Sequence, residues 1–68
     1  MNYYRQLARV EASIKRRYND FLSESPLVCG SYLSWLHSCR ETASERKQYN
    51  IAYLIQDLII KEIEEIEP

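Results

Sequence analysis

Residues 51–60, IAYLIQDLII, are apolar around well over half of a helical circumference. Apolar residues continue at helical spacing on both sides of this stretch, and the set comprises Tyr49, Ala52, Leu54, Ile55, Leu58, Ile59, Ile63 and Ile66. Such spacing is typical of an amphipathic helix with one broad buried face. Upstream, Thr42-Ala43-Ser44-Glu45 has the pattern of a capping box, in which the Thr hydroxyl accepts a hydrogen bond from the N–H of Glu45. We therefore predict a helix that begins after Thr42 and runs to about Ile66.

A second amphipathic pattern lies between Asn2 and Leu22. Its apolar stripe, at steps of four, three, four and seven residues, consists of Tyr3, Leu7, Val10, Ile14 and Phe21. Arg17 interrupts this stripe, which is flanked by Tyr4, Ala8, Tyr18 and Leu22. The apolar face is therefore broader than a coiled-coil seam. We predict that this helix ends near Ser23, because Pro26 disfavours helical angles in the residue before it.

The middle of the chain predicts a shorter helix that ends at about Arg40. Two starts fit the pattern. Ser25 followed by Pro26 has the order of an N-cap and a first helical residue, and Ser31 is a competing N-cap. The sequence leaves this choice open.

Composition limits the chain to one small all-α domain, residues 1–68. The single glycine excludes a glycine-rich phosphate loop and disfavours a many-turned β-sandwich. The longest uncharged run, residues 25–39, has fifteen residues with Pro, Gly and four Ser, whereas a membrane span needs about 20 mostly apolar residues. With no apolar leader and two cysteines expected as thiols, we predict a cytoplasmic protein without a membrane segment.

The lengths of the predicted helices favour self-association. At 1.5 Å per residue they are about 32, 22 and 37 Å long, so a short middle helix cannot cover both long ones. A domain of about 60 residues also buries only roughly 60% of its unfolded surface. We therefore predict a three-helix bundle with two long helices and a short middle helix, completed by self-association, with a homodimer favoured. The expected self-association residues are Leu7, Val10, Ile14, Ile55, Leu58, Ile59 and Ile63.

Charge is divided along the chain. Residues 1–22 contain five basic and two acidic residues, whereas residues 41–68 contain three basic and seven acidic ones. In an up-down-up bundle the first and third helices are parallel, which would place residues 15–17 (KRR) near the acidic residues of 62–65 (EIEE). This pairing could form within one chain or between two.

Tyrosines and arginines are the candidates for contact with a partner. Six tyrosines and one tryptophan stand among 68 residues, and both types are favoured at protein interfaces. Arg5, Arg9 and Arg16 lie along one edge of the predicted first helix and could contact the phosphates of a nucleic acid. The pI of about 5.8 is lower than such binding usually requires. The expected partner-binding residues are Tyr4, Arg5, Arg9, Arg16, Tyr18, Tyr49 and Tyr53.

The spacing of the histidine and the cysteines argues against a zinc site and against a catalytic base–nucleophile pair. Cys29, His37 and Cys39 are of zinc-ligand type, but on one helix residues 29 and 39 are about 15 Å apart along the axis. His37 and Cys39 are two residues apart, so their side chains diverge by about 200° on a helix and cannot form a base–nucleophile pair. We expect no metal, no cofactor and no enzymatic activity.

Tyr4–Arg9, YRQLAR, resembles the start of the LYR-motif family of helical accessory proteins, in which Leu-Tyr-Arg opens the first helix. Here Tyr3 stands in place of the leucine, and the match covers only six residues, so no function is taken from it. In size and composition the chain is similar to small helical inhibitors and antirepressors encoded by mobile elements, which act by binding a host or repressor protein. We expect a module that binds and inhibits another protein. The alternative is a nucleic-acid-binding helical dimer that uses the basic first helix.

Overall fold

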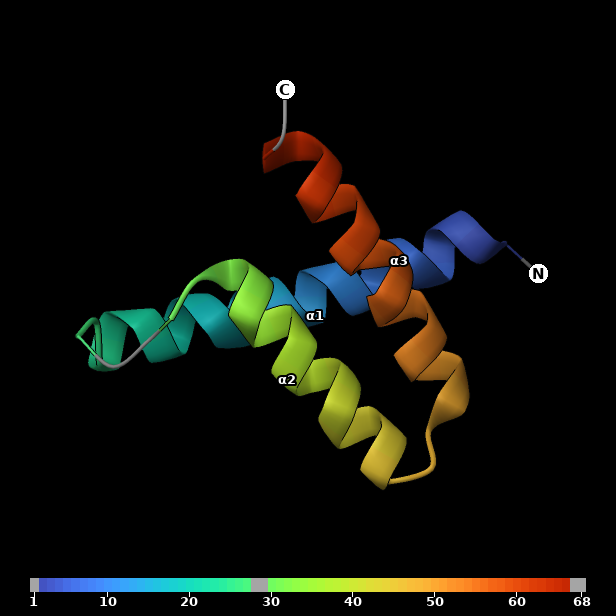
Figure 1. Ribbon diagram of the computed structural model, residues 1–68, viewed down its shortest axis with the longest axis horizontal. Coiled ribbons are helices and arrows are strands. Elements are labelled where there is room, and N and C mark those ends of the chain that lie inside the picture. Colours follow the sequence, from blue (N-terminus) through green and yellow to red (C-terminus); the bar gives the residue numbers. More distant parts are fainter. Residues whose placement is uncertain (1, 28–29, 67–68) are drawn as a thin grey trace.

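The computed structural model describes residues 2–27 and 30–66, and three α-helices form in this part of the chain. They are α1 (Tyr3–Glu24), α2 (Tyr32–Glu45) and α3 (Tyr49–Ile66). α2 and α3 form an antiparallel hairpin, and α1 crosses this hairpin obliquely (Figure 1). The predicted all-α class and three-helix bundle are confirmed. Within the described residues, no helix is both long enough and apolar enough to cross a bilayer.

The core lies where the three helices meet. α3 contributes half of its buried residues, as the apolar character of residues 51–60 predicts. Leu36 of α2 is fully buried, with no accessible surface. The complete buried cluster consists of Ile14, Leu36, Ala43, Ile55, Leu58 and Ile59. Partly buried residues such as Leu7, Val10 and Leu33 pack around this cluster.

Side-chain caps start the first two helices. The Oδ1 atom of Asn2 accepts a hydrogen bond from the N–H of Tyr4 at 3.0 Å, so α1 begins where the sequence predicts. The Oγ atom of Ser31 accepts from the N–H of Ser34 at 3.1 Å and caps α2. Of the two predicted starts of the middle helix, Ser31 is correct and Pro26 is wrong, because Pro26 lies in a turn. Val28 and Cys29, which the longer helix would have included, lie outside the described residues.

The capping-box prediction at residues 42–45 is wrong. These four residues form the last turn of α2, which continues past Arg40 because Ala43, seven residues after Leu36, is buried in the same core. The N–H of Gln48 donates to the carbonyl of Ala43 at 2.8 Å, and Lys47 adopts a left-handed φ of 60°. The chain therefore reverses over residues 46–48, and α3 has 18 residues, or about 27 Å.

The crossing of α1 also changes the predicted charge pairing. Lys61 of α3 lies 3.4 Å from Glu11 of α1, and Lys15 lies 3.6 Å from the same carboxylate. Tyr3 donates a further hydrogen bond to Asp57. Within the described residues, no ion pair joins the basic stretch 15–17 to the acidic residues of 62–65. Because α1 crosses α3 instead of running beside it, Glu11 makes the interhelical pair.

Replacing Ser31 with alanine tests the start of α2. Loss of this cap should lower the free energy of unfolding by about 1 kcal/mol. For a domain of this size, that loss corresponds to a fall of about 4–8 °C in Tm. Circular dichroism melts of Ser31→Ala and wild type measure it. Thr42→Ala is the control and should leave Tm unchanged or slightly raised, because Thr42 lies inside a helix and alanine is the better helix former. The opposite ranking would contradict the position of the turn.

Candidate functional site

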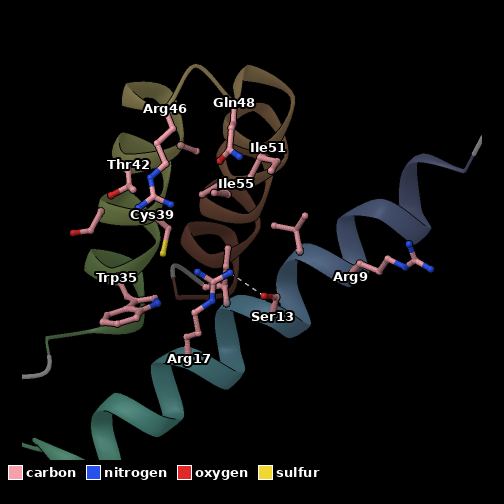
Figure 2. A pocket seen from close by; sticks show the side chains of 14 residues that line it. Arg9, Ser13, Arg17, Trp35, Cys39, Thr42, Arg46, Gln48, Ile51 and Ile55 are labelled. Atoms are coloured by element: carbon pink, nitrogen blue, oxygen red, sulfur yellow. Dashed lines mark hydrogen bonds between the residues drawn. The ribbon is translucent and has the colours of Figure 1, made fainter.

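A groove of about 630 Å³ opens beside the core, between all three helices (Figure 2). It forms because α1 crosses the hairpin obliquely and leaves the halves of α2 and α3 nearest the turn without a third helix over them (Figure 1). Its apolar residues are Val10, Ile14, Trp35, Ala43, Ile51 and Ile55. Its volume lies within the range of sites that hold a ligand or a few side chains of a partner.

The charged residues that line this groove, Arg9, Arg17 and Arg46, are all arginines. We call the site the arginine-lined groove. Arg17 and Arg46 reach toward Cys39 from α1 and from the end of α2, whereas Arg9 points away (Figure 2). The guanidinium of Arg17 donates to the hydroxyl of Ser13 at 3.0 Å. Neither Arg17 nor Arg46 pairs with a carboxylate of residues 2–27 or 30–66. The groove thus combines an apolar floor with uncompensated positive charge.

Cys39 contributes a half-buried thiol to the groove. Burial raises the pKa of Cys39 above its ordinary value of 9.0, and the opposing effect of Arg17 does not offset it. The thiol is therefore protonated at neutral pH and is a weak nucleophile. His37 is exposed and does not line the groove. Cys29, the third residue of the zinc hypothesis, lies outside the described residues, within which no three His, Cys, Asp or Glu side chains gather closely enough to hold a metal.

An aromatic cluster joins the end of α1 to the start of α2, next to the groove. The ring centroid of Tyr18 lies 5.3 Å from that of Tyr32 and 5.7 Å from that of Trp35, and Phe21 lies 5.4 Å from Trp35. The hydroxyl of Tyr18 also donates to the carbonyl of Gly30 at 3.0 Å. These contacts place Trp35 at one end of the groove and give Tyr18 a role in the fold itself.

Of the seven residues predicted to bind a partner, most lie outside the groove. Tyr4, Tyr49 and Tyr53 are exposed, as are the three predicted arginines, but Arg9 alone of the seven lines the groove. The sequence prediction did not include Arg17 or Arg46, the other two arginines that line the groove. A signal for Arg17 was present, since this charged residue interrupts the apolar stripe of α1. No such signal marked Arg46, because the capping-box pattern assigned it to the wrong helix.

Most of the residues predicted for self-association pack in or against the core of the chain itself. Four of them, Ile14, Ile55, Leu58 and Ile59, are buried in the core. Leu7 and Val10 are partly buried against it. Ile63 is 38% exposed. Other large apolar residues of α3 are exposed in their place, namely Tyr49, Ile51, Tyr53, Ile60 and Ile66.

No protein-family model, no curated protein and no solved structure matches this chain. The short resemblance to the LYR-motif family is therefore not supported by a match to a family model. The fold and the groove define a three-helix, all-α protein with an apolar-floored groove lined by three arginines.

Tyr32 gives a pH-dependent test of this arrangement. Burial, with the carboxylates of Glu11 and Glu62, raises the pKa of Tyr32 to about 12 from 10.0. As pH rises, the Tyr32 hydroxyl therefore deprotonates at a lower pH in the unfolded chain than in the folded chain. Tyr32 contributes fully to stability below about pH 10, and this contribution declines between about pH 10 and 12. We expect Tyr32→Phe to reduce this alkaline decline. Its hydroxyl has no hydrogen-bond partner among the described residues, so stability at pH 7 should not fall.

Urea unfolding of Tyr32→Phe and wild type at pH 7 and between pH 10 and 12 measures both effects. Tyr53→Phe, at an exposed position, is the matched control and should follow wild type at every pH. An unchanged alkaline slope for Tyr32→Phe would contradict the assigned environment of Tyr32. So would a loss of stability at pH 7.

Proposed function

We propose that this chain is a protein-binding module whose arginine-lined groove receives an amphipathic helix of another protein. The observation that carries the proposal is the combination of an apolar floor with Arg17 and Arg46, which have no carboxylate partner in the described part of the chain. A guanidinium pairs with a carboxylate through two parallel hydrogen bonds. The favoured occupant therefore carries an Asp or Glu beside its apolar face.

The apolar floor favours a protein over a nucleic acid as the occupant. An amphipathic helix buries side chains at positions i, i+3 and i+4 in such a groove, and Val10, Trp35 and Ile51, which line the groove without being fully buried, supply the matching apolar surface. A nucleic-acid backbone would instead require phosphate contacts along a basic stripe. Arg5 and Arg16, the other members of the predicted basic edge, do not line the groove.

We further propose that binding modulates the partner by covering the helix that enters the groove. If this helix takes part in the partner's own contacts, occupation of the groove removes it from them. The expected effect is inhibition, the mode of action of the inhibitors and antirepressors that the chain resembles in size and composition. The chain need contribute no chemical step to this effect.

Comparative capture tests the proposal. The immobilised wild-type chain and a double variant, Arg17→Glu with Arg46→Glu, are each exposed to a lysate of the source organism. Proteins retained by the wild type and lost by the variant are identified by mass spectrometry and purified. Isothermal titration calorimetry then measures direct binding. Arg5→Glu, exposed and outside the groove, is the matched control and should capture the same protein as wild type. Identical capture by all three chains would contradict the proposal.

A further inference from the structure

The last turns of α3 and the arginine-lined groove carry opposite charges that the chain itself does not neutralise. Residues 62–66, EIEEI, contain three glutamates and two isoleucines, and we call this segment the acidic end of α3. None of the three glutamates forms an ion pair within the described residues, and the last turn of α3 contains no basic residue. The glutamates also lie at the carboxyl end of a helix, where the helix dipole adds negative potential. The acidic end of α3 therefore favours contact with a cationic surface.

The acidic end of α3 has the pattern that the proposed function requires of a helix that enters the groove. Ile63 and Ile66 are three residues apart on the helix and form a short apolar ridge, exposed by 38 and 59%. Glu62 lies about 40° from Ile66 around the helix axis, and Glu64 lies about 100° from Ile63 on the other side. Carboxylates thus flank the ridge on both sides, as arginines from α1 and from the end of α2 flank the groove (Figure 2).

One chain cannot bring these two surfaces together. The groove is lined by Ile51 and Ile55 of α3, and Ile63 lies 12 residues beyond Ile51 on the same helix, or about 18 Å along its axis. The C-terminal turns of α3 project past α1, on the opposite side of α1 from the turn between α2 and α3 (Figure 1). Because α3 is one continuous helix, it cannot bend back into its own groove. A second copy can supply its acidic end instead.

From these two surfaces we infer that the acidic end of α3 of one copy occupies the arginine-lined groove of a second copy. The isoleucine ridge then lies against the apolar residues of the groove, and the flanking glutamates pair with Arg17 and Arg46. The two surfaces differ, so the contact is head-to-tail, and each copy can both receive and supply a helix end.

This contact regulates the groove, and in that respect the inference rests on the proposed function. The helix of the partner and the acidic end of a second copy have the same chemistry, so they compete for one site. At high concentration the chain covers its own grooves. At low concentration the grooves are open to the partner.

Sedimentation equilibrium of the full chain from about 10 µM to about 1 mM tests the inference, because one helix end buries a small interface and such interfaces associate weakly. Wild type should associate reversibly. The groove variant, Arg17→Glu with Arg46→Glu, should weaken this association at least about tenfold, because it places like charges in the contact. The end variant, Glu62→Lys with Glu64→Lys, should weaken it as much for the same reason.

A charge-matched variant separates this contact from the general charge of the chain. Asp20→Lys with Glu24→Lys changes the net charge as the end variant does, at exposed positions of α1 outside the groove. It should associate like wild type. Circular dichroism checks that all variants keep their helices.

An equimolar mixture of the groove variant and the end variant gives the most specific result. Each variant alone should stay dissociated, but the mixture should recover association. The groove variant supplies an unchanged acidic end to the unchanged groove of the end variant, and the two reversed surfaces are also complementary. Recovery in the mixture would also show that neither variant has lost its fold.

A monomeric wild type, or a mixture of folded variants that recovers nothing, would overturn the inference. So would an association that both charge variants keep and Tyr53→Glu loses, since the exposed apolar residues of α3 would then pair the copies. These measurements contain no other protein, so they are independent of the capture experiment. A monomeric wild type that still captures a partner through the groove would overturn the self-association and leave the proposed function standing.

Discussion

Ile55→Asp should be unfolded at neutral pH. Ile55 is 2% exposed and belongs to the buried cluster that holds α3 against α1 and α2. Burial of a carboxylate without a partner, together with the loss of a large apolar side chain, costs about 4 kcal/mol or more. A chain of 68 residues has only about 3–10 kcal/mol of stability in total. The substitution therefore removes most or all of it.

Far-ultraviolet circular dichroism and urea unfolding measure this loss. Ile60→Asp is the matched control on the same helix. Ile60 is 45% exposed, so its substitution should leave the monomer folded, with a change of less than about 1 kcal/mol. A folded, cooperative Ile55→Asp variant would show that α3 does not use this face for the core. Equal effects at both positions would contradict the assigned orientation of α3.

Reversing the charge of the groove should abolish partner binding. For Arg17→Glu with Arg46→Glu, we expect the affinity for the captured partner to fall at least about hundredfold, equivalent to about 2.7 kcal/mol. Both arginines are exposed at the rim, and Arg17 contacts only Ser13 among the hydrogen bonds described, so the fold should persist. Isothermal titration calorimetry measures the affinity, and circular dichroism confirms the helices.

Two controls separate the groove from the general charge of the chain. Arg5→Glu changes the net charge on α1 outside the groove and should alter the affinity by no more than about threefold. Arg17→Lys keeps the charge but loses the bidentate geometry, so an intermediate loss is expected. If Arg5→Glu weakens binding as much as the groove variants do, long-range attraction alone accounts for the affinity, and the groove is not the binding site.

Periodicity predicted the helices well, because the steps of three and four residues are set by the geometry of the helix itself. The apolar stripe of α1 and the apolar residues 51–60 of α3 mark two helices that form, although α3 begins at Tyr49 and not after Thr42. The turn between α2 and α3 was placed too early. The sequence Thr42–Glu45 satisfies a local capping rule, but burial of Ala43 beside Leu36 keeps these residues helical. Tertiary packing overrides the local signal here.

The groove could not be predicted from the sequence, because it depends on the angle at which α1 crosses the hairpin. Helices of similar lengths packed side by side would have covered this surface. They would also have placed Arg17 beside the acidic end of α3, where its charge would be neutralised. In the structure, Glu11 of α1 forms the ion pair with Lys61 of α3, and Arg17 lines the groove. The candidate site is thus a consequence of helix orientation, which spacing along one helix does not determine.

Site-specific photo-crosslinking tests most directly whether another protein occupies the arginine-lined groove. Ser38 lines the groove, whereas Ser44, on the same helix, is exposed and does not line it. Each serine is replaced in turn by a benzoylphenylalanine, and the chain is irradiated with the purified partner. We predict a crosslinked complex from position 38 and none from position 44. Efficient crosslinking from position 44 with none from position 38 would contradict the account.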